Sequence, residues 1–248
     1  MSGPKGFKRS TPPLLCWEFC AKAFHDLPEC DEYDQSTIVK NLKIGGFTKQ
    51  SFIDWKGRTC AVVFTKGCNF RCSYCHNPSL VLKNQIKKMP DIDPDEILDY
   101  LKSRKDWLDG VVVTGGEPTL HIGLPEFLCK IKSLGLAVKL DTNGSNPCLL
   151  KELIAHELVD YVAMDIKTCL KKEAYNEITN CSDQNLIEKI QQSLEVLRSS
   201  GIDYQLRTTA LPGHHTEAVM NELKQQFGGE HYVVQKFREG DVLGKYED

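Results

Sequence analysis

Three closely spaced cysteines are the residues of this sequence best suited to carry chemistry. Cys68, Cys72 and Cys75 follow the pattern C-x3-C-x2-C, and three thiolates on one loop can hold a compact metal centre. A structural zinc site or an electron-transfer iron–sulfur cluster would take a fourth ligand, and His76 is awkwardly placed to reach the same ion. Three ligands leave one coordination position open, as in a catalytic centre. We therefore expect a centre that binds a substrate or cofactor directly, with zinc or a chance grouping of cysteines as the alternatives.

Glycine and polar motifs recur further along the chain. Gly115 and Gly116 precede Glu117 and Pro118. Paired glycines let a backbone approach a ligand closely, so carbonyl groups there could accept hydrogen bonds from an ammonium group. Ordinary explanations stay open for each motif, namely a turn, a solvated ion pair or a surface arginine. The other candidate binding residues are Asp141, Thr142, Asn143, Asp165, Lys167 and Arg207.

These residues fall at the ends of expected β-strands. Strands that alternate with helices predict a parallel sheet covered on its outside by helices. Six strands are too few to close an eight-stranded barrel, so we expect an α/β fold, a partial (βα)6 barrel of parallel strands with outer helices. Reactive groups in such folds collect at the C-terminal ends of the strands. The strands are expected at 60–65, 111–114, 137–141, 161–165, 204–208 and 232–235, and the helices near 93–107, 123–134, 147–157, 184–200 and 215–227.

Composition excludes several classes of protein. The 248 residues include 31 Lys and Arg against 34 Asp and Glu, a formal net charge of −3, which leaves no basic excess for nucleic acid. Eleven cysteines are too few for a disulfide scaffold of this length, and their odd number favours metal or redox chemistry in a reducing compartment. No apolar run reaches the ~20 residues that cross a bilayer, and the apolar stretch near the N-terminus is short for a signal peptide. We expect a cytoplasmic protein that binds neither nucleic acid nor membrane.

The cysteine segment resembles the radical S-adenosyl-L-methionine (radical SAM) superfamily. The motif of that superfamily has the same spacing and an aromatic residue before the third cysteine, here Tyr74. The resemblance implies a 4Fe-4S cluster held by Cys68, Cys72 and Cys75, whose fourth iron chelates the amino and carboxylate groups of S-adenosyl-L-methionine. The motif Gly115–Pro118 resembles the segment that binds the methionine amino group in that superfamily.

Two later motifs resemble those of the enzymes that activate glycyl-radical enzymes, including the pyruvate formate-lyase activases. This resemblance implies that Asp141, Thr142 and Asp165 help to form a monovalent-cation site beside the cofactor carboxylate. It also implies that Lys167 lies near the cofactor. Arg207, at the end of the fifth expected strand, is expected to contact the ribose or carboxylate of the cofactor.

Residues 44–57 and 235–238 are similar to stretches of anaerobic ribonucleoside-triphosphate reductase activating proteins. The resemblance implies an oxidoreductase that cleaves S-adenosyl-L-methionine reductively to a 5′-deoxyadenosyl radical and generates a glycyl radical on a partner enzyme. An anaerobic ribonucleotide reductase is the first expected partner and a pyruvate formate-lyase type enzyme the second, with a flavodoxin or ferredoxin-like electron donor. Two alternatives stay open: a radical SAM enzyme acting on a small molecule or nucleoside, such as the 7-carboxy-7-deazaguanine synthases, and a noncatalytic metal-binding module.

Residues 1–45 are expected to form a short irregular N-terminal extension, and residues 46–248 the radical SAM domain. The extension has several prolines, an acidic patch and little periodicity, which indicates weak intrinsic structure. Cys16, Cys20 and Cys30 could bind zinc or a second cluster, but their spacing matches no pattern. We therefore favour unliganded cysteines in a partner-docking or loosely packed segment.

Overall fold

The strands lie side by side in the order in which they occur in the sequence. The computed structural model describes residues 41–245, and their sheet has the strand order β1 to β7. β1 pairs with β2 in antiparallel orientation, and all later neighbours are parallel. The strands are β1 (Ile44–Ser51), β2 (Cys60–Thr65), β3 (Gly110–Gly115), β4 (Ala137–Thr142), β5 (Tyr161–Asp165), β6 (Asp203–Ala210) and β7 (Tyr232–Lys236).

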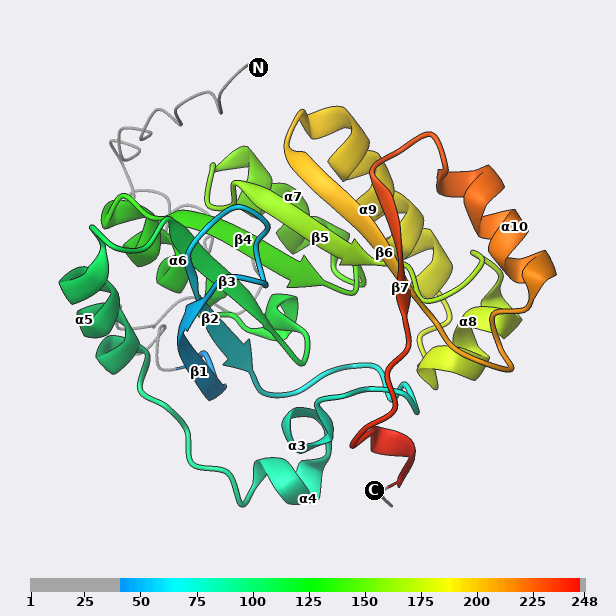
Figure 1. The fold of residues 1–248 in the computed structure, drawn as a ribbon, viewed down its shortest axis with the longest axis horizontal. Helices are drawn as coiled ribbons and strands as arrows, with labels where there is room; N and C mark the ends of the chain where they lie inside the picture. Colours follow the sequence, from blue (N-terminus) through cyan, green and yellow to red (C-terminus); the bar gives the residue numbers. More distant parts are fainter. Residues whose placement is uncertain (1–40, 246–248) are drawn as a thin grey trace.

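Helices lie around the outside of the curved sheet (Figure 1). Two short helices directly follow the cysteine segment and lie near the C-terminal end of the described chain in the same view. None of the helices between residues 41 and 245 combines the length and the apolar character needed to cross a bilayer. The helices are α3 (Pro78–Val81), α4 (Lys83–Ile86), α5 (Pro94–Arg104), α6 (Leu124–Ser133), α7 (Pro147–Ala155), α8 (Lys172–Thr179), α9 (Leu186–Ser200) and α10 (Glu217–Phe227), with 3-10 turns η1 (Pro118–Leu120) and η2 (Leu243–Lys245).

The predicted α/β partial barrel is confirmed. All six predicted strands occur as β2 to β7, and the five predicted helices occur as α5, α6, α7, α9 and α10, with ends that differ by a few residues. Their regular apolar patterns made these elements predictable. The predicted irregular extension falls mainly on residues 1–40, which lie outside the described residues, so it stays a prediction.

β1 is a strand that the sequence pattern did not indicate. It begins with two glycines after Ile44 and continues through polar residues, most of them exposed or half-buried. Its burial does not alternate, because three successive residues, Thr48 to Gln50, are exposed, so the strand lacks the period of two that marks a half-buried strand. It is held instead by pairing with β2 and by Ile44, which is fully buried.

Alternate residues of the parallel strands contribute to two apolar clusters. Val63 and Val111 pack in the large cluster with side chains from the surrounding helices. Val62 and Val112 belong to a smaller cluster on the other side of the sheet, together with Trp55 from the loop between β1 and β2. Alternate side chains of each strand therefore point to opposite faces of the sheet. One set packs against the outer helices, and the other set packs inside the barrel against this loop.

Trp55 fills the inside of the barrel at the end where the strands begin. Its side chain is buried, its ring centroid lies 6.0 Å from that of Tyr161, and the Arg58 guanidinium lies 4.4 Å above it. Gly110 makes room for the ring, because a Cβ at this position would lie 2.9 Å from Trp55 Cζ3. The loop thus closes the end of the barrel that is opposite the motifs.

Trp55→Ala should lower the free energy of unfolding by about 3–5 kcal/mol, because it leaves a large cavity in a close-packed interior. Trp107→Ala is the matched control, since Trp107 is 75% exposed and its loss should change that free energy by less than about 0.5 kcal/mol. Urea unfolding followed by circular dichroism measures both. Equal effects of the two substitutions would show that Trp55 does not fill the barrel.

Candidate active site

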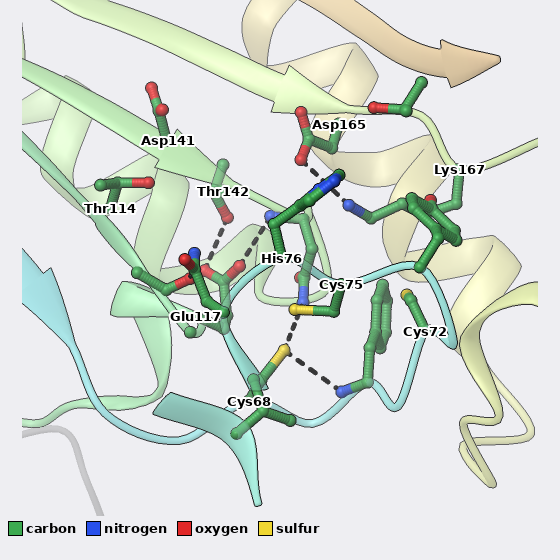
Figure 2. Close-up of a pocket in the computed structure, with 18 of the residues that line it drawn as sticks. Cys68, Cys72, Cys75, His76, Thr114, Glu117, Asp141, Thr142, Asp165 and Lys167 are labelled. Atoms are coloured by element: carbon green, nitrogen blue, oxygen red, sulfur yellow. Dashed lines mark hydrogen bonds and ion pairs between the residues drawn. The ribbon is translucent and has the colours of Figure 1, made fainter. Parts of the chain in front are cut away.

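One cavity at the C-terminal ends of the strands brings the predicted site residues together. Figure 2 shows Cys68, Cys72 and Cys75 on one side of it, and Asp141, Thr142 and Asp165 on the strand ends that face them. All thirteen candidate residues from the sequence line this cavity. Their spatial grouping follows from the fold, while their individual roles stay predictions. The cavity is also lined by residues outside this candidate set: Phe70, His76, Asn77, Val81, Thr114 and Thr209.

The cysteine loop follows β2 and is fixed by backbone contacts. The Gly67 amide donates to the Leu80 carbonyl at 2.6 Å, and the Arg71 amide donates to the Thr179 carbonyl at 2.7 Å. The Arg71 guanidinium also donates to the Cys68 carbonyl at 2.7 Å. Within the loop, the Cys75 amide donates to the Cys72 carbonyl at 2.9 Å. These bonds hold an irregular segment in one shape, so its three thiols all face the cavity.

The thiols are in surroundings that suit an iron–sulfur cluster. Burial raises the pKa of Cys68 to about 12 and that of Cys72 to about 11, so a cationic centre is needed to bind them as thiolates at neutral pH. The Phe70 amide points at Cys68 Sγ from 3.4 Å, and Asn143 Nδ2 lies 3.9 Å from the same sulfur. Such donors stabilise a ligated sulfur.

The spacing of the thiols argues against a single ion. Among residues 41–245, no three Cys, His, Asp or Glu side chains converge closely enough to hold one metal ion. In a four-iron cluster each cysteine ligates its own iron, so the sulfurs lie apart around the cluster. His76 does not supply a further ligand in this arrangement, because its Nε2 lies 2.8 Å from the Arg238 carbonyl oxygen. The donor set therefore fits a cluster with three protein ligands better than a mononuclear zinc site.

Gly115 and Gly116 let the end of β3 pack directly on the cysteine loop. A Cβ on Gly116 would lie only 1.9 Å from the Gly67 carbonyl oxygen, and Gly115 has φ +117°, where side chains are strained. The Glu117 amide donates to the Gly67 carbonyl at 2.8 Å. The glycine pair is thus required for the contact between the end of β3 and the cysteine loop. It is also expected to present its backbone carbonyl groups to a ligand.

Glu117 joins the ends of β3 and β4. Its side chain is almost fully buried, at 1% exposure. Its carboxylate accepts hydrogen bonds from Thr142 Oγ1 at 2.7 Å, the Asn143 amide at 2.6 Å and Thr119 Oγ1 at 2.5 Å. Burial raises the pKa of Glu117, and the hydrogen bonds from Thr119, Asn143 and Thr142 oppose that rise. Both oxygens are occupied by protein donors, so the geometry assigns Glu117 to positioning the neighbouring motifs.

Five charged side chains on or directly after β4, β5 and β6 form a connected network. Arg207 Nε donates to Asp165 Oδ1 at 2.8 Å, and its Nη1 donates to Asp141 Oδ2 at 3.2 Å. Lys167 Nζ donates to the second Asp165 oxygen at 2.9 Å. Lys139 Nζ forms an ion pair with the second Asp141 oxygen, also at 2.9 Å. The network presents both signs of charge to the cavity, as binding a zwitterionic ligand requires.

The network keeps Asp165 ionised. Burial alone would raise the pKa of Asp165, but the charges of Arg207 and Lys167 outweigh it and lower this pKa to about 2. Burial alone would lower the pKa of Lys167, but the negative charge of Asp165 outweighs burial and holds the pKa of Lys167 well above its ordinary value. At neutral pH the site is therefore a set of fixed ions.

Asp165 should stabilise the fold at neutral pH and cease to do so in acid. Its pKa is below the unfolded value of ~3.9, so its contribution is present above that value and is lost as the pH falls toward 2. Asp165→Asn should therefore be less stable at pH 7 and lose less stability than the wild type between pH 5 and pH 3. Urea unfolding across this range measures it, with the exposed Asp106→Asn as control. If the free energy of unfolding depended on pH in the same way for the wild type and Asp165→Asn, the lowered pKa of Asp165 would be contradicted.

Comparison with known proteins gives the same assignment to a family as the cysteine motif and the geometry of the site. The model of the radical SAM superfamily matches residues 62–224, and the chain belongs to this superfamily. Membership implies a 4Fe-4S cluster and S-adenosyl-L-methionine as cofactors. Within the superfamily the chain is of the glycyl-radical-enzyme activase type, as its relatives indicate.

Two relatives support this placement, and one solved structure shows a similar fold. A candidate glycyl-radical enzyme activating enzyme of Methanocaldococcus jannaschii is 31% identical over 206 residues, which cover 80% of this chain and 81% of the relative. A pyruvate formate-lyase-activating enzyme of Clostridium pasteurianum is 36% identical over 114 residues, 43% of this chain and 44% of the relative. The structure of anSMEcpe with bound AdoMet, at 22% identity, has a TM-score of 0.53 over 69% of this chain and 50% of that one, and shows the same fold.

Proposed function

We propose that this enzyme cleaves S-adenosyl-L-methionine and generates a glycyl radical on a partner enzyme, with anaerobic ribonucleoside-triphosphate reductase as the first candidate partner. The observation that carries the proposal is the open cysteine triad. Cys68, Cys72 and Cys75 line one cavity with the charged strand ends, and no fourth cysteine of residues 41–245 lines it. A cluster held this way keeps one iron for the cofactor. The relative from M. jannaschii, matched over most of both chains, supports an activating role.

The chain's own residues would hold and orient the cofactors. A cluster bound by the three cysteines would supply the one electron needed for reductive cleavage of the C5′–S bond of S-adenosyl-L-methionine, and the reaction would end with methionine, 5′-deoxyadenosine and a glycyl radical on the partner. Gly115 and Gly116 offer backbone groups to the methionine ammonium, as the family resemblance implies. Lys167 and Arg207 supply positive charge for its carboxylate, with Tyr74 buried beside the cysteines.

A monovalent cation is part of the proposal. Asp141, Thr142 and Asp165 are the oxygen donors that match the family's cation site. Arg207 already bridges the two carboxylates, so a cation here would compete with that side chain. Measuring S-adenosyl-L-methionine affinity in sodium, potassium and tetramethylammonium salts tests this step. Equal affinity in all three would remove the cation from the proposal.

The same chemistry indicates what the partner must provide, what donates the electron and in which compartment the enzyme works. A glycine loop of the partner must reach the mouth of the cavity, because a carbon-centred radical acts only on an atom in contact with it. The electron would come from a flavodoxin or ferredoxin-like protein. We place the enzyme in the cytoplasm, since a reducing compartment protects thiolate-bound iron.

The test is formation of the radical on the partner. The reconstituted protein, S-adenosyl-L-methionine and dithionite are incubated anaerobically with each candidate glycyl-radical enzyme, and electron paramagnetic resonance is recorded. We expect a glycyl doublet with one partner and none when its radical-site glycine is replaced by alanine. Cofactor cleavage without a doublet on any glycyl-radical enzyme would favour the alternative, a radical SAM enzyme that acts on a small molecule or nucleoside.

A further inference from the structure

The last described residues pack against the outer side of the cysteine loop. The Leu243 amide donates to the Cys75 carbonyl at 2.9 Å, and the Gly244 amide donates to the Ser73 carbonyl at 2.6 Å. In Figure 1 this end of the chain, drawn in red, lies beside α3 after leaving β7. Two main-chain hydrogen bonds thus join the C-terminal segment to the loop that carries the cluster ligands.

Leu243 adds an apolar contact at the same place. It is 8% exposed and forms a small cluster with Val81 and Leu82, against which the partly buried Cys68 and Cys75 pack. Gly244 approaches the loop so closely that a Cβ would lie 3.0 Å from the Ser73 carbonyl oxygen. The contact is therefore largely buried and closely fitted, unlike a chain segment that lies loosely on a surface.

A second contact holds the other end of the segment. His76 Nε2 lies 2.8 Å from the Arg238 carbonyl oxygen, and the His76 and Phe237 ring centroids are 5.5 Å apart. Contacts at Ser73, Cys75 and His76 thus tie residues 237–244 to the loop at three positions. We call residues 237–244 the C-terminal strap.

We propose that the C-terminal strap holds the third cluster ligand in place and excludes water from that edge of the cluster, with Leu243 as the positioning residue. The cysteine loop is irregular, so it depends on contacts from other segments to stay closed. Local opening of a loop governs the access of solvent to what it covers. The proposal rests on the cluster that the family implies and is independent of which substrate the enzyme uses.

Leu243→Ala tests the strap in the cluster-loaded full chain. Under anaerobic conditions, iron release to a ferrous chelator should be at least about tenfold faster than in the wild type, because most of a buried leucine's contacts with its neighbours are lost. The midpoint potential of the cluster should also rise, since water near the cluster favours the reduced form, which carries one more negative charge. The thermal midpoint of the fold should change little.

Two further variants make the result specific. Val242→Ala, one residue away on the strap and outside the Leu243 cluster, should release iron at the wild-type rate. Gly244→Pro removes the N–H that is donated to Ser73 and should act in the same direction as Leu243→Ala. Wild-type iron release and potential in both Leu243→Ala and Gly244→Pro would overturn the proposal. Equal acceleration in Val242→Ala would overturn the assignment to Leu243.

Discussion

Replacing Cys72 by alanine should reduce S-adenosyl-L-methionine cleavage to the level of a mixture without protein, while leaving the fold intact. Cys72 is buried at 7% exposure and lines the cavity with Cys68 and Cys75. Two remaining thiolates cannot hold a four-iron cluster that already has one open iron. Without the cluster there is no electron for the cofactor, so the loss is complete rather than partial.

The fold of Cys72→Ala should survive because the change removes only one non-hydrogen atom from the side chain. Losing a buried sulfur costs about 1 kcal/mol, well within the stability of a domain of this size. Iron content, 5′-deoxyadenosine after addition of dithionite, and circular dichroism are measured on the same sample. Cys148→Ala is the control, since this thiol is exposed and lies outside the cavity. Full cleavage by Cys72→Ala would remove the cysteine triad from the mechanism.

Replacing Glu117 should have the second largest effect, although Glu117 itself need not touch the cofactor. Glu117→Ala leaves the donors of Thr119, Thr142 and Asn143 buried without an acceptor. Each unsatisfied buried donor costs about 1–3 kcal/mol, so the free energy of unfolding should fall by about 3–5 kcal/mol. Because Thr142 ends β4 and Asn143 begins the loop that follows it, the affinity for S-adenosyl-L-methionine should fall as well.

Glu117→Gln distinguishes the effect of the side chain's volume from the effect of its charge and hydrogen-bond acceptors. The amide keeps the volume but replaces one acceptor oxygen by a donor, which must face either the Asn143 amide or the two threonine hydroxyls. We expect a loss of about 2 kcal/mol and weaker cofactor binding by about tenfold. Urea unfolding and calorimetric titration measure the two effects, and Glu195→Gln, at an exposed position of α9, serves as control. Wild-type behaviour of Glu117→Gln would show that its hydrogen bonds do not position the site.

The sequence was sufficient to predict those features that depend on a local pattern of residues. Val111 to Val113 form a strand because a short apolar run precedes a glycine turn. The site residues could be grouped because parallel strands bring their C-terminal ends together. The strand β1 was missed because its polar edge carries no such pattern.

Other features depend on contacts between distant segments and have no local signal. The sequence shows Gly116 as part of a turn motif, whereas the structure shows it pressed against Gly67. Glu117 has the appearance of an exposed ligand group in the sequence, yet its partners lie 25 and 26 residues away on another strand end. The contact of Leu243 with Cys75 joins two segments that lie far apart in the sequence, so only the folded structure could indicate it.

The most direct test of the proposed function follows one hydrogen atom. The partner glycyl-radical enzyme is prepared with dideuterated glycine, incubated with the reconstituted protein, S-adenosyl-L-methionine and dithionite, and the 5′-deoxyadenosine is analysed by mass spectrometry. Because the radical takes its hydrogen from the partner's glycine, the product should contain one deuterium per molecule, and none with a partner whose radical-site glycine is alanine. Unlabelled 5′-deoxyadenosine from the deuterated partner would contradict the account.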